Sequence, residues 1–171
     1  MCYPLNPLNF YAVTYASQPP IVQGHTLRKL SAEEITASCE WLLDTALRHH
    51  CPYWLLDGRA HVQEQPQSLH DWMREDYLPR VRQTLGQQLC IGFLVPPAVW
   101  ASLPGKGYPQ PLDWQSHAAR LGWFTNEASA LDWLAQQRCR ESLPPATTGK
   151  NPAPYGAGLP GSPWSPVVQV P

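Results

Sequence analysis

The sequence predicts a mixed α/β domain, and three observations lead to that fold class. Short apolar runs that suit buried strands alternate with segments in which apolar residues recur every three or four positions, as in amphipathic helices. Strand-like residues 10–16 and 21–27 are too close for a crossover helix, so they predict an antiparallel hairpin. Each later strand-like segment follows a helical one, which favours parallel pairing. We expect a mixed four- to five-stranded sheet with a parallel core, an N-terminal β-hairpin and helices packed mainly on one side.

The first predicted helix begins after Ser31. Ser31 and Glu34 have the spacing of a capping box, in which the hydroxyl and the carboxylate each satisfy a backbone amide. Apolar residues then follow at spacings of three and four up to Leu47, and Pro52 prevents the helix from continuing.

Two continuous apolar runs, residues 53–56 and 89–95, predict the centre of the sheet. Neither run alternates with polar residues, which is typical of parallel strands that are covered on both faces. We expect the two strands to lie side by side and to run in the same direction.

The segment between these strands predicts a second helix, which Ser68 can cap and which Pro79 must kink or restart. After the second strand, a short helical turn is expected around residues 98–103, then a weak helix over residues 112–120 and a short strand over 121–124. A last helix should open at Asn126.

Composition excludes several classes of function. The formal net charge is -1, from 12 Lys and Arg against 13 Asp and Glu, so no positive field is present to attract nucleic acid. No apolar run approaches the roughly 20 residues that span a bilayer, so no membrane span is expected. The N-terminus does not look like a secretory signal, and five widely spaced cysteines favour a reducing compartment. The expected location is cytoplasmic.

Proline and glycine divide the chain into three parts. We expect an N-terminal arm over residues 1–7, an α/β domain over 8–140 and a disordered tail over 141–171. The tail is rich in Pro and Gly and offers few aliphatic side chains to offset the entropy of ordering it.

The element order and several local sequences resemble small bacterial STAS-like proteins, single domains related to the anti-sigma-factor antagonists. The resemblance covers roughly residues 8 to 137. It is carried by Trp54-Leu55-Leu56-Asp57-Gly58-Arg59, Asp71-Trp72, Leu78-Pro79-Arg80, Phe93-Leu94-Val95, and Phe124 with Ala130-Leu131-Asp132-Trp133-Leu134.

The resemblance implies protein–protein regulation or ligand sensing without covalent chemistry. Phosphoregulated members carry a Ser in an Asp-Ser-Ser-Gly-like turn after a central strand. This chain departs from that pattern, because Gly58-Arg59-Ala60-His61 occupies the turn and the next hydroxyl is Ser68. Ser68 can be read as a phosphate acceptor at the start of a helix or as a plain N-cap.

Titratable residues gather around the loop after the strand at 53–56. Asp57, Arg59, His61, His70 and Asp71 invite an acid–base interpretation, but the sequence shows neither a substrate cavity nor hydrogen-bond reach among them. Consecutive ligand-type residues point in different directions, which does not suit a metal. We predict no catalytic residue, no metal site and no cofactor.

Aromatic residues suggest a second surface. Trp100, Tyr108 and Trp114 flank an irregular Pro/Gly segment, and exposed together they would form a patch for a partner. Core packing is the alternative for each of them.

We expect a regulatory or protein–protein interaction module without catalytic activity. The interaction candidates are Asp57, Arg59, His61, Ser68, Trp100, Tyr108 and Trp114. A carrier or sensor of a small apolar ligand such as a lipid is the alternative, and an enzyme of unknown class is the third.

Overall fold

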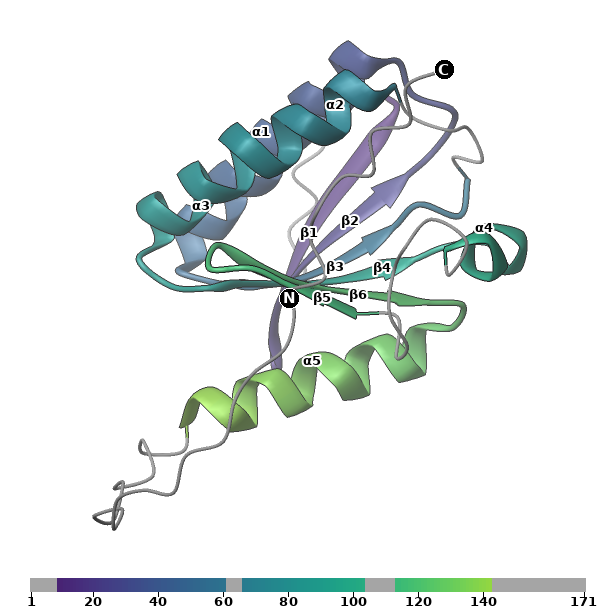
Figure 1. Cartoon of the computed structure of the whole chain (residues 1–171). Coiled ribbons are helices and arrows are strands. Elements are labelled where there is room, and N and C mark those ends of the chain that lie inside the picture. Colours follow the sequence, from purple (N-terminus) through teal and green to yellow (C-terminus); the bar gives the residue numbers. More distant parts are fainter. Residues whose placement is uncertain (1–8, 61–65, 104–112, 143–171) are drawn as a thin grey trace, which may run out of the picture.

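A computed structural model describes residues 9–60, 66–103 and 113–142. Its strands form one six-stranded sheet in the order β1-β2-β3-β4-β6-β5 (Figure 1). The strands are β1 (Tyr11–Ser17), β2 (Pro20–Thr26), β3 (Tyr53–Asp57), β4 (Leu89–Leu94), β5 (Asp113–Gln115) and β6 (Ala119–Phe124). The predicted arm and nearly all of the predicted tail lie outside the described residues.

The N-terminal hairpin and the parallel core are confirmed. β1 pairs antiparallel with β2, while β2, β3, β4 and β6 run parallel to one another. The two strands expected at the centre are direct neighbours, with Trp54 opposite Ile91.

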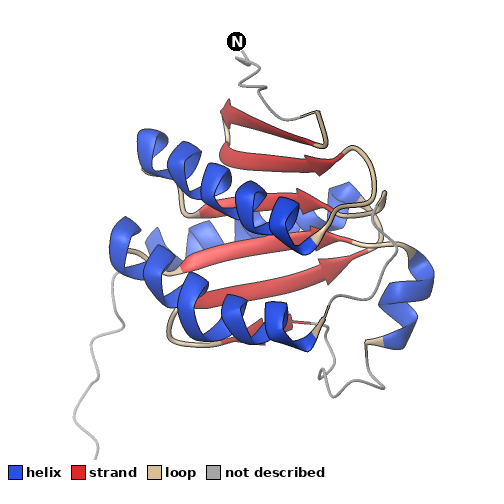
Figure 2. Ribbon diagram, turned by 90° about the horizontal axis from the view of Figure 1, so that it is seen from above, coloured by secondary structure: helices blue, strands red, loops and turns tan. Residues whose placement is uncertain are grey.

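Helices cover both faces of this sheet (Figures 1 and 2). Strands β2, β3, β4 and β6 are added in one direction, so right-handed crossovers place α1 (Ala32–His49) and α3 (Leu78–Leu85) on the same face. Helix α5 (Glu127–Ser142) follows the last strand and packs on the opposite face, against β3, β4 and β6.

Helix α1 has the expected start. The Ser31 hydroxyl accepts a hydrogen bond from the Glu34 amide at 3.2 Å, and the Glu34 carboxylate accepts one from the Ser31 amide at 3.0 Å. The helix ends where His50 adopts a left-handed conformation with φ 49°.

The segment before β4 has three parts. These are α2 (Gln67–Trp72), a single π-helical turn η1 (Met73–Tyr77) and α3, which carries Pro79 in its first turn. The restart at Pro79 agrees with the loss of a helical amide there. The expected N-cap at Ser68 is wrong, because Pro66 occupies the cap position and Ser68 lies exposed within the first turn of α2.

The region after β4 differs most from expectation. Helix α4 (Pro97–Ser102) follows β4 as expected, but the prediction of a helix over 112–120 is wrong, because Asp113–Gln115 forms β5 and pairs antiparallel with β6. The sheet therefore has six strands instead of the expected four to five. A tight turn joins the two strands. In it, the Ser116 hydroxyl accepts hydrogen bonds from the backbone amides of Ala118 and Ala119, both at 3.1 Å.

The core lies on both sides of β3 and β4. Trp54 is 1% exposed, and Cys39 and Cys90 are buried there as expected for small apolar residues. The Tyr77 hydroxyl donates to the Cys39 carbonyl at 2.5 Å and so joins the second helical segment to α1. Gly24 leaves room for a tyrosine: a Cβ at this position would overlap the Tyr11 hydroxyl and lie 2.8 Å from its Cζ.

Candidate functional site

The parallel strands all end at one edge of the sheet, which we call the carboxyl edge. Ligand sites in open α/β sheets gather at such an edge. Backbone hydrogen bonds hold the strand ends together: the Gly58 amide donates to the Leu94 carbonyl at 3.0 Å, and the Val95 amide donates to the Phe124 carbonyl at 2.9 Å.

Asp57 and Arg59 form an ion pair at this edge. Arg59 donates to both carboxylate oxygens of Asp57, from Nε at 2.9 Å and from Nη2 at 2.6 Å. The Arg59 backbone amide also donates to Asp57, at 3.1 Å. The Asp57 side chain is 16% exposed and that of Arg59 is 47% exposed, so the pair presents the guanidinium to solvent.

The pair fixes the protonation of Asp57. Hydrogen bonds from the Arg59 side chain lower the pKa of the carboxyl, and partial burial opposes this only in part. The pKa of Arg59 is raised, chiefly by its hydrogen bonds to Asp57, with a smaller contribution from the charge of Glu127 at the start of α5. A carboxylate held in this way is a poor proton acceptor at neutral pH.

His25 completes the polar centre of the carboxyl edge. It lies opposite Asp57 in the register of β2 and β3, with Nδ1 3.7 Å from Asp57 Oδ2. Asp57 therefore has a cation-forming group on each side, and the negative charge is locally compensated.

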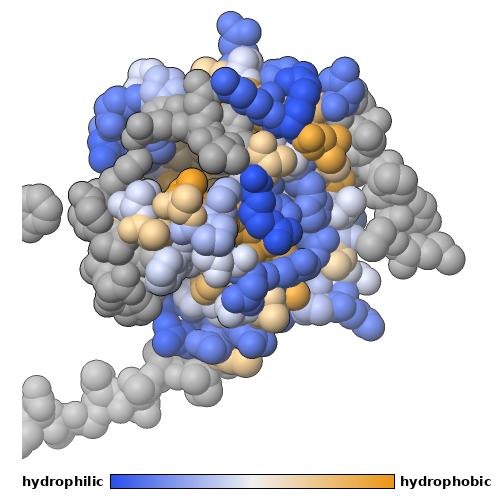
Figure 3. All heavy atoms as spheres, turned by 90° about the vertical axis from the view of Figure 1, so that its right-hand side faces the viewer, coloured by the Kyte–Doolittle hydropathy of each residue, from blue (hydrophilic) through white to orange (hydrophobic). Residues whose placement is uncertain are grey.

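Two exposed apolar side chains belong to segments that follow the strands on either side of β3. Leu27, just after β2, is 52% exposed, and Trp100 on α4, just after β4, is 37% exposed. They are the exposed large hydrophobic residues of the described ranges. Figure 3 looks onto this edge and shows orange apolar patches separated by blue hydrophilic ones. We call Leu27, His25, Asp57, Arg59 and Trp100 the carboxyl-edge surface.

The structure brings two of the predicted interaction residues, Asp57 and Arg59, into contact. Trp100 lies on α4, after the neighbouring strand β4, and Ser68 lies exposed on α2 without a described hydrogen bond to the pair. Trp114 belongs to β5, and its side chain is outside the described part of the structure, as are His61 and Tyr108 entirely.

Two other acid–base candidates, Asp71 and His70, lie on α2. Asp71 Oδ1 accepts from Gln67 at 2.9 Å and from Arg74 at 3.1 Å. His70 is exposed on α2. Burial raises the pKa of the Cys39 thiol to about 12, so this sulfur stays protonated.

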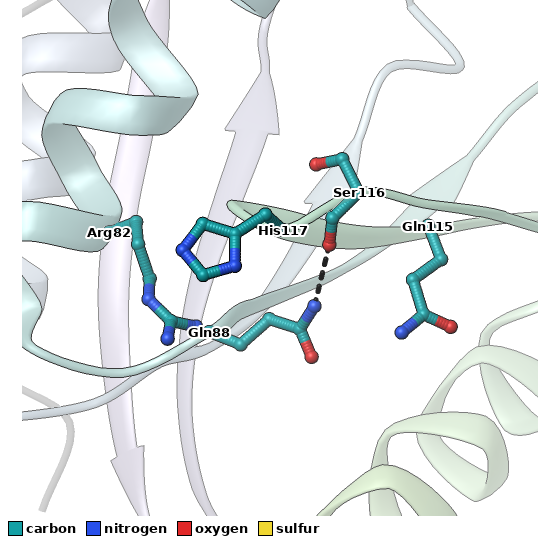
Figure 4. Close-up of a pocket in the computed structure, with 5 residues that line it drawn as sticks. All are labelled: Arg82, Gln88, Gln115, Ser116 and His117. Carbon is teal, nitrogen blue, oxygen red and sulfur yellow. Dashed lines mark hydrogen bonds between the residues drawn. The ribbon is translucent and has the colours of Figure 1, made fainter.

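Sequence reasoning missed a second region, at the opposite edge of the sheet. An open hollow of about 670 Å³ is lined by Arg82, Gln88, Gln115, Ser116 and His117 (Figure 4). A neighbouring hollow of about 710 Å³ shares Arg82, Ser116 and His117 with it. We call the first one the amino-edge hollow.

One signal in the sequence could have pointed to this hollow. Arg48, Arg74 and Arg80 each have an acidic residue three or four positions earlier, and ion pairs form there. Arg82 has no acidic residue three or four positions away in either direction. No carboxylate one turn away on the same helix can therefore pair with Arg82.

Comparison with known proteins yields no relative: no family model, no curated protein and no solved structure matches the chain. Within the described residues, no three His, Cys, Asp or Glu side chains gather as a metal site would require. The helices of the same residues are too short or too polar to cross a membrane.

Proposed function

We propose that the protein is a regulatory module of the STAS-like type without catalytic activity, acting in the cytoplasm by binding a protein partner at the carboxyl-edge surface. One observation carries this proposal: exposed Leu27 and Trp100 follow β2 and β4, the strands on either side of β3, whose end carries the Asp57–Arg59 pair. Exposed Trp and Arg side chains are the residues that most often dominate binding energy at protein interfaces.

The polar centre suits recognition better than proton transfer. Asp57 is ionised and held by two hydrogen bonds from Arg59, so neither group is free to exchange a proton near neutral pH. The exposed face of the guanidinium can still donate to a carboxylate or a carbonyl of a partner.

The backbone that supports the carboxyl-edge surface is held in place by hydrogen bonds, as a docking site requires. Backbone hydrogen bonds hold the ends of β3, β4 and β6 in fixed positions. Helix α4 contributes no buried residue, so Trp100 is presented to solvent rather than used by the core. A partner would therefore meet a surface that is already ordered.

The test is quantitative co-purification from the native host with the tagged full chain. We compare the wild type with Arg59→Ala and with Trp100→Ala. Arg140→Ala is the control, because Arg140 is an exposed arginine on α5 outside this surface. A protein retained by the wild type and the control, but lost with both test variants, is the expected result.

The captured protein is then purified and titrated against each variant. We expect Arg59→Ala and Trp100→Ala each to weaken the dissociation constant by about tenfold or more. Absence of any specific protein, or equal binding by all four chains, would overturn the proposal.

A further inference from the structure

Two arginines of the described residues lie on α5: Arg138 over the Tyr53 ring, and Arg140 exposed near the end of the helix. The other seven fall into two groups. Five of them lie within ion-pair distance of a carboxylate: Arg28, Arg48, Arg59, Arg74 and Arg80. Arg82 and Arg120 have no carboxylate partner in the described ranges, and both belong to the region of the amino-edge hollow.

Arg82 and His117 line the hollow from two directions. Arg82 comes from α3, and His117 comes from the turn between β5 and β6 (Figure 4). The Gln88 amide donates to the Ser116 carbonyl at 2.8 Å and joins the start of β4 to this turn. None of the described residues that line the hollow is acidic.

Arg120 does not line the hollow, but it is hydrogen-bonded to the lining residue Gln115, so a second positive charge lies beside it. Its guanidinium donates to two amide oxygens, those of Gln115 at 2.9 Å and of Gln137 on α5. Amide oxygens carry no net charge, so the charge of Arg120 is not neutralised. Its Nε is buried and has no hydrogen-bond partner in the described structure.

We propose that the amino-edge hollow binds the phosphate group of a small phosphorylated molecule, through Arg82 and His117 with added charge from Arg120. An oxyanion would supply the countercharge that the protein itself does not provide here. Phosphate suits the hollow because arginine and imidazole donate to its oxygens from different directions. A volume of about 670 Å³ also accommodates the organic part of such a molecule.

This site is separate from the carboxyl-edge surface. The hollow lies where β4 and β6 begin, and none of its lining residues comes from the end of β3 that carries Asp57 or from α4 that carries Trp100. This proposal therefore does not rest on the proposed partner interaction.

The test is an NMR titration of the isotope-labelled full chain with inorganic phosphate, and then with pyrophosphate, with sodium chloride replaced to keep ionic strength constant. We expect saturable shifts of the Ser116 and His117 amides and of the Gln88 and Gln115 side-chain amides. Loss of one hydrogen-bonding group should weaken binding by about five- to tenfold in Arg82→Gln and in His117→Ala.

The matched control is Arg28→Gln, which removes the same charge from a residue beside the opposite edge, where Arg28 pairs with Glu34. Its phosphate affinity should stay within twofold of the wild type. His117 lies exposed in a surface turn, so His117→Ala keeps the test valid should Arg82→Gln fold poorly. Shifts that do not saturate, that spread evenly over the surface, or that persist with equal affinity in the folded test variants would overturn the proposal.

Discussion

Charged side chains are paired differently at the two ends of the parallel strands. At the carboxyl edge, Asp57 is satisfied within two residues by Arg59 and faces His25 across the neighbouring strand. At the amino edge, Arg82 and Arg120 reach only amides or solvent in the described structure. At the carboxyl edge a nearby side chain therefore compensates the partly buried charge, whereas at the amino edge Arg82 and Arg120 have no carboxylate partner among the described residues, which is the basis for the proposed phosphate site.

The largest expected effect comes from removing the compensated acid. Asp57→Ala leaves the Arg59 side chain and its backbone amide without their acceptor, so we expect a loss of about 1–2 kcal/mol in the free energy of unfolding. Arg82→Ala removes no described ion pair and should stay within about 0.5 kcal/mol of the wild type. Urea denaturation of both variants checks this contrast, and equal losses would contradict it.

A second prediction concerns the arginine that is bonded only to amides. Arg120→Leu leaves the Gln137 side chain, which is 3% exposed, without its donor, and we expect a cost of about 1–2 kcal/mol. The double variant Arg120→Leu/Gln137→Leu removes both polar groups and should recover most of that loss. Chemical denaturation of the single and the double variant tests this expectation. A double variant less stable than the single one would contradict it and show that the Arg120–Gln137 interaction stabilises the fold.

The third prediction compares how the stability effects of variants at the two edges depend on pH. The pKa of Asp57 is lower in the folded chain than the value of about 3.9 in an unfolded one, so its stabilisation is present above that pH and is lost as pH falls through the folded value. The stability gap between wild type and Asp57→Asn should therefore narrow from pH 7 to pH 3. The gap between wild type and Arg82→Gln should not change, because arginine does not titrate there. Denaturation curves across this range provide the measurement.

Trp100→Ala should have only a small effect on stability. Trp100 is 37% exposed and α4 contributes no buried residue, so the free energy of unfolding, measured by urea denaturation, should fall by no more than about 1 kcal/mol. Partner binding should nevertheless fall by about tenfold. A clearly destabilised variant would assign Trp100 to the fold rather than to the carboxyl-edge surface.

The strand core could be predicted because its signals are local. The apolar runs at 53–56 and 89–95 contain few polar side chains, and burial on both faces is the arrangement that satisfies such runs. The start of α1 was equally readable, since Ser31 and Glu34 satisfy each other's amides within one turn.

The missed features depend on contacts between distant residues. Asp113–Gln115 becomes a strand through pairing with β6, which no local preference of those three residues announces. Ser68 was a reasonable cap from its side chain, but Pro66 suits the cap position because its fixed φ and extended ψ lead directly into α2. The amino-edge hollow joins α3, the start of β4 and the β5–β6 turn, and no sequence motif spans those segments.

The tyrosine that occupies the space beside Gly24 has a consequence for how this sequence can vary. A side chain at position 24 collides with the end of the Tyr11 side chain, so position 24 is constrained as long as Tyr11 is kept. A lineage that acquires alanine or serine at position 24 must first, or at the same time, exchange Tyr11 for a shorter residue. Homologues should therefore rarely combine tyrosine at position 11 with a residue other than glycine at position 24.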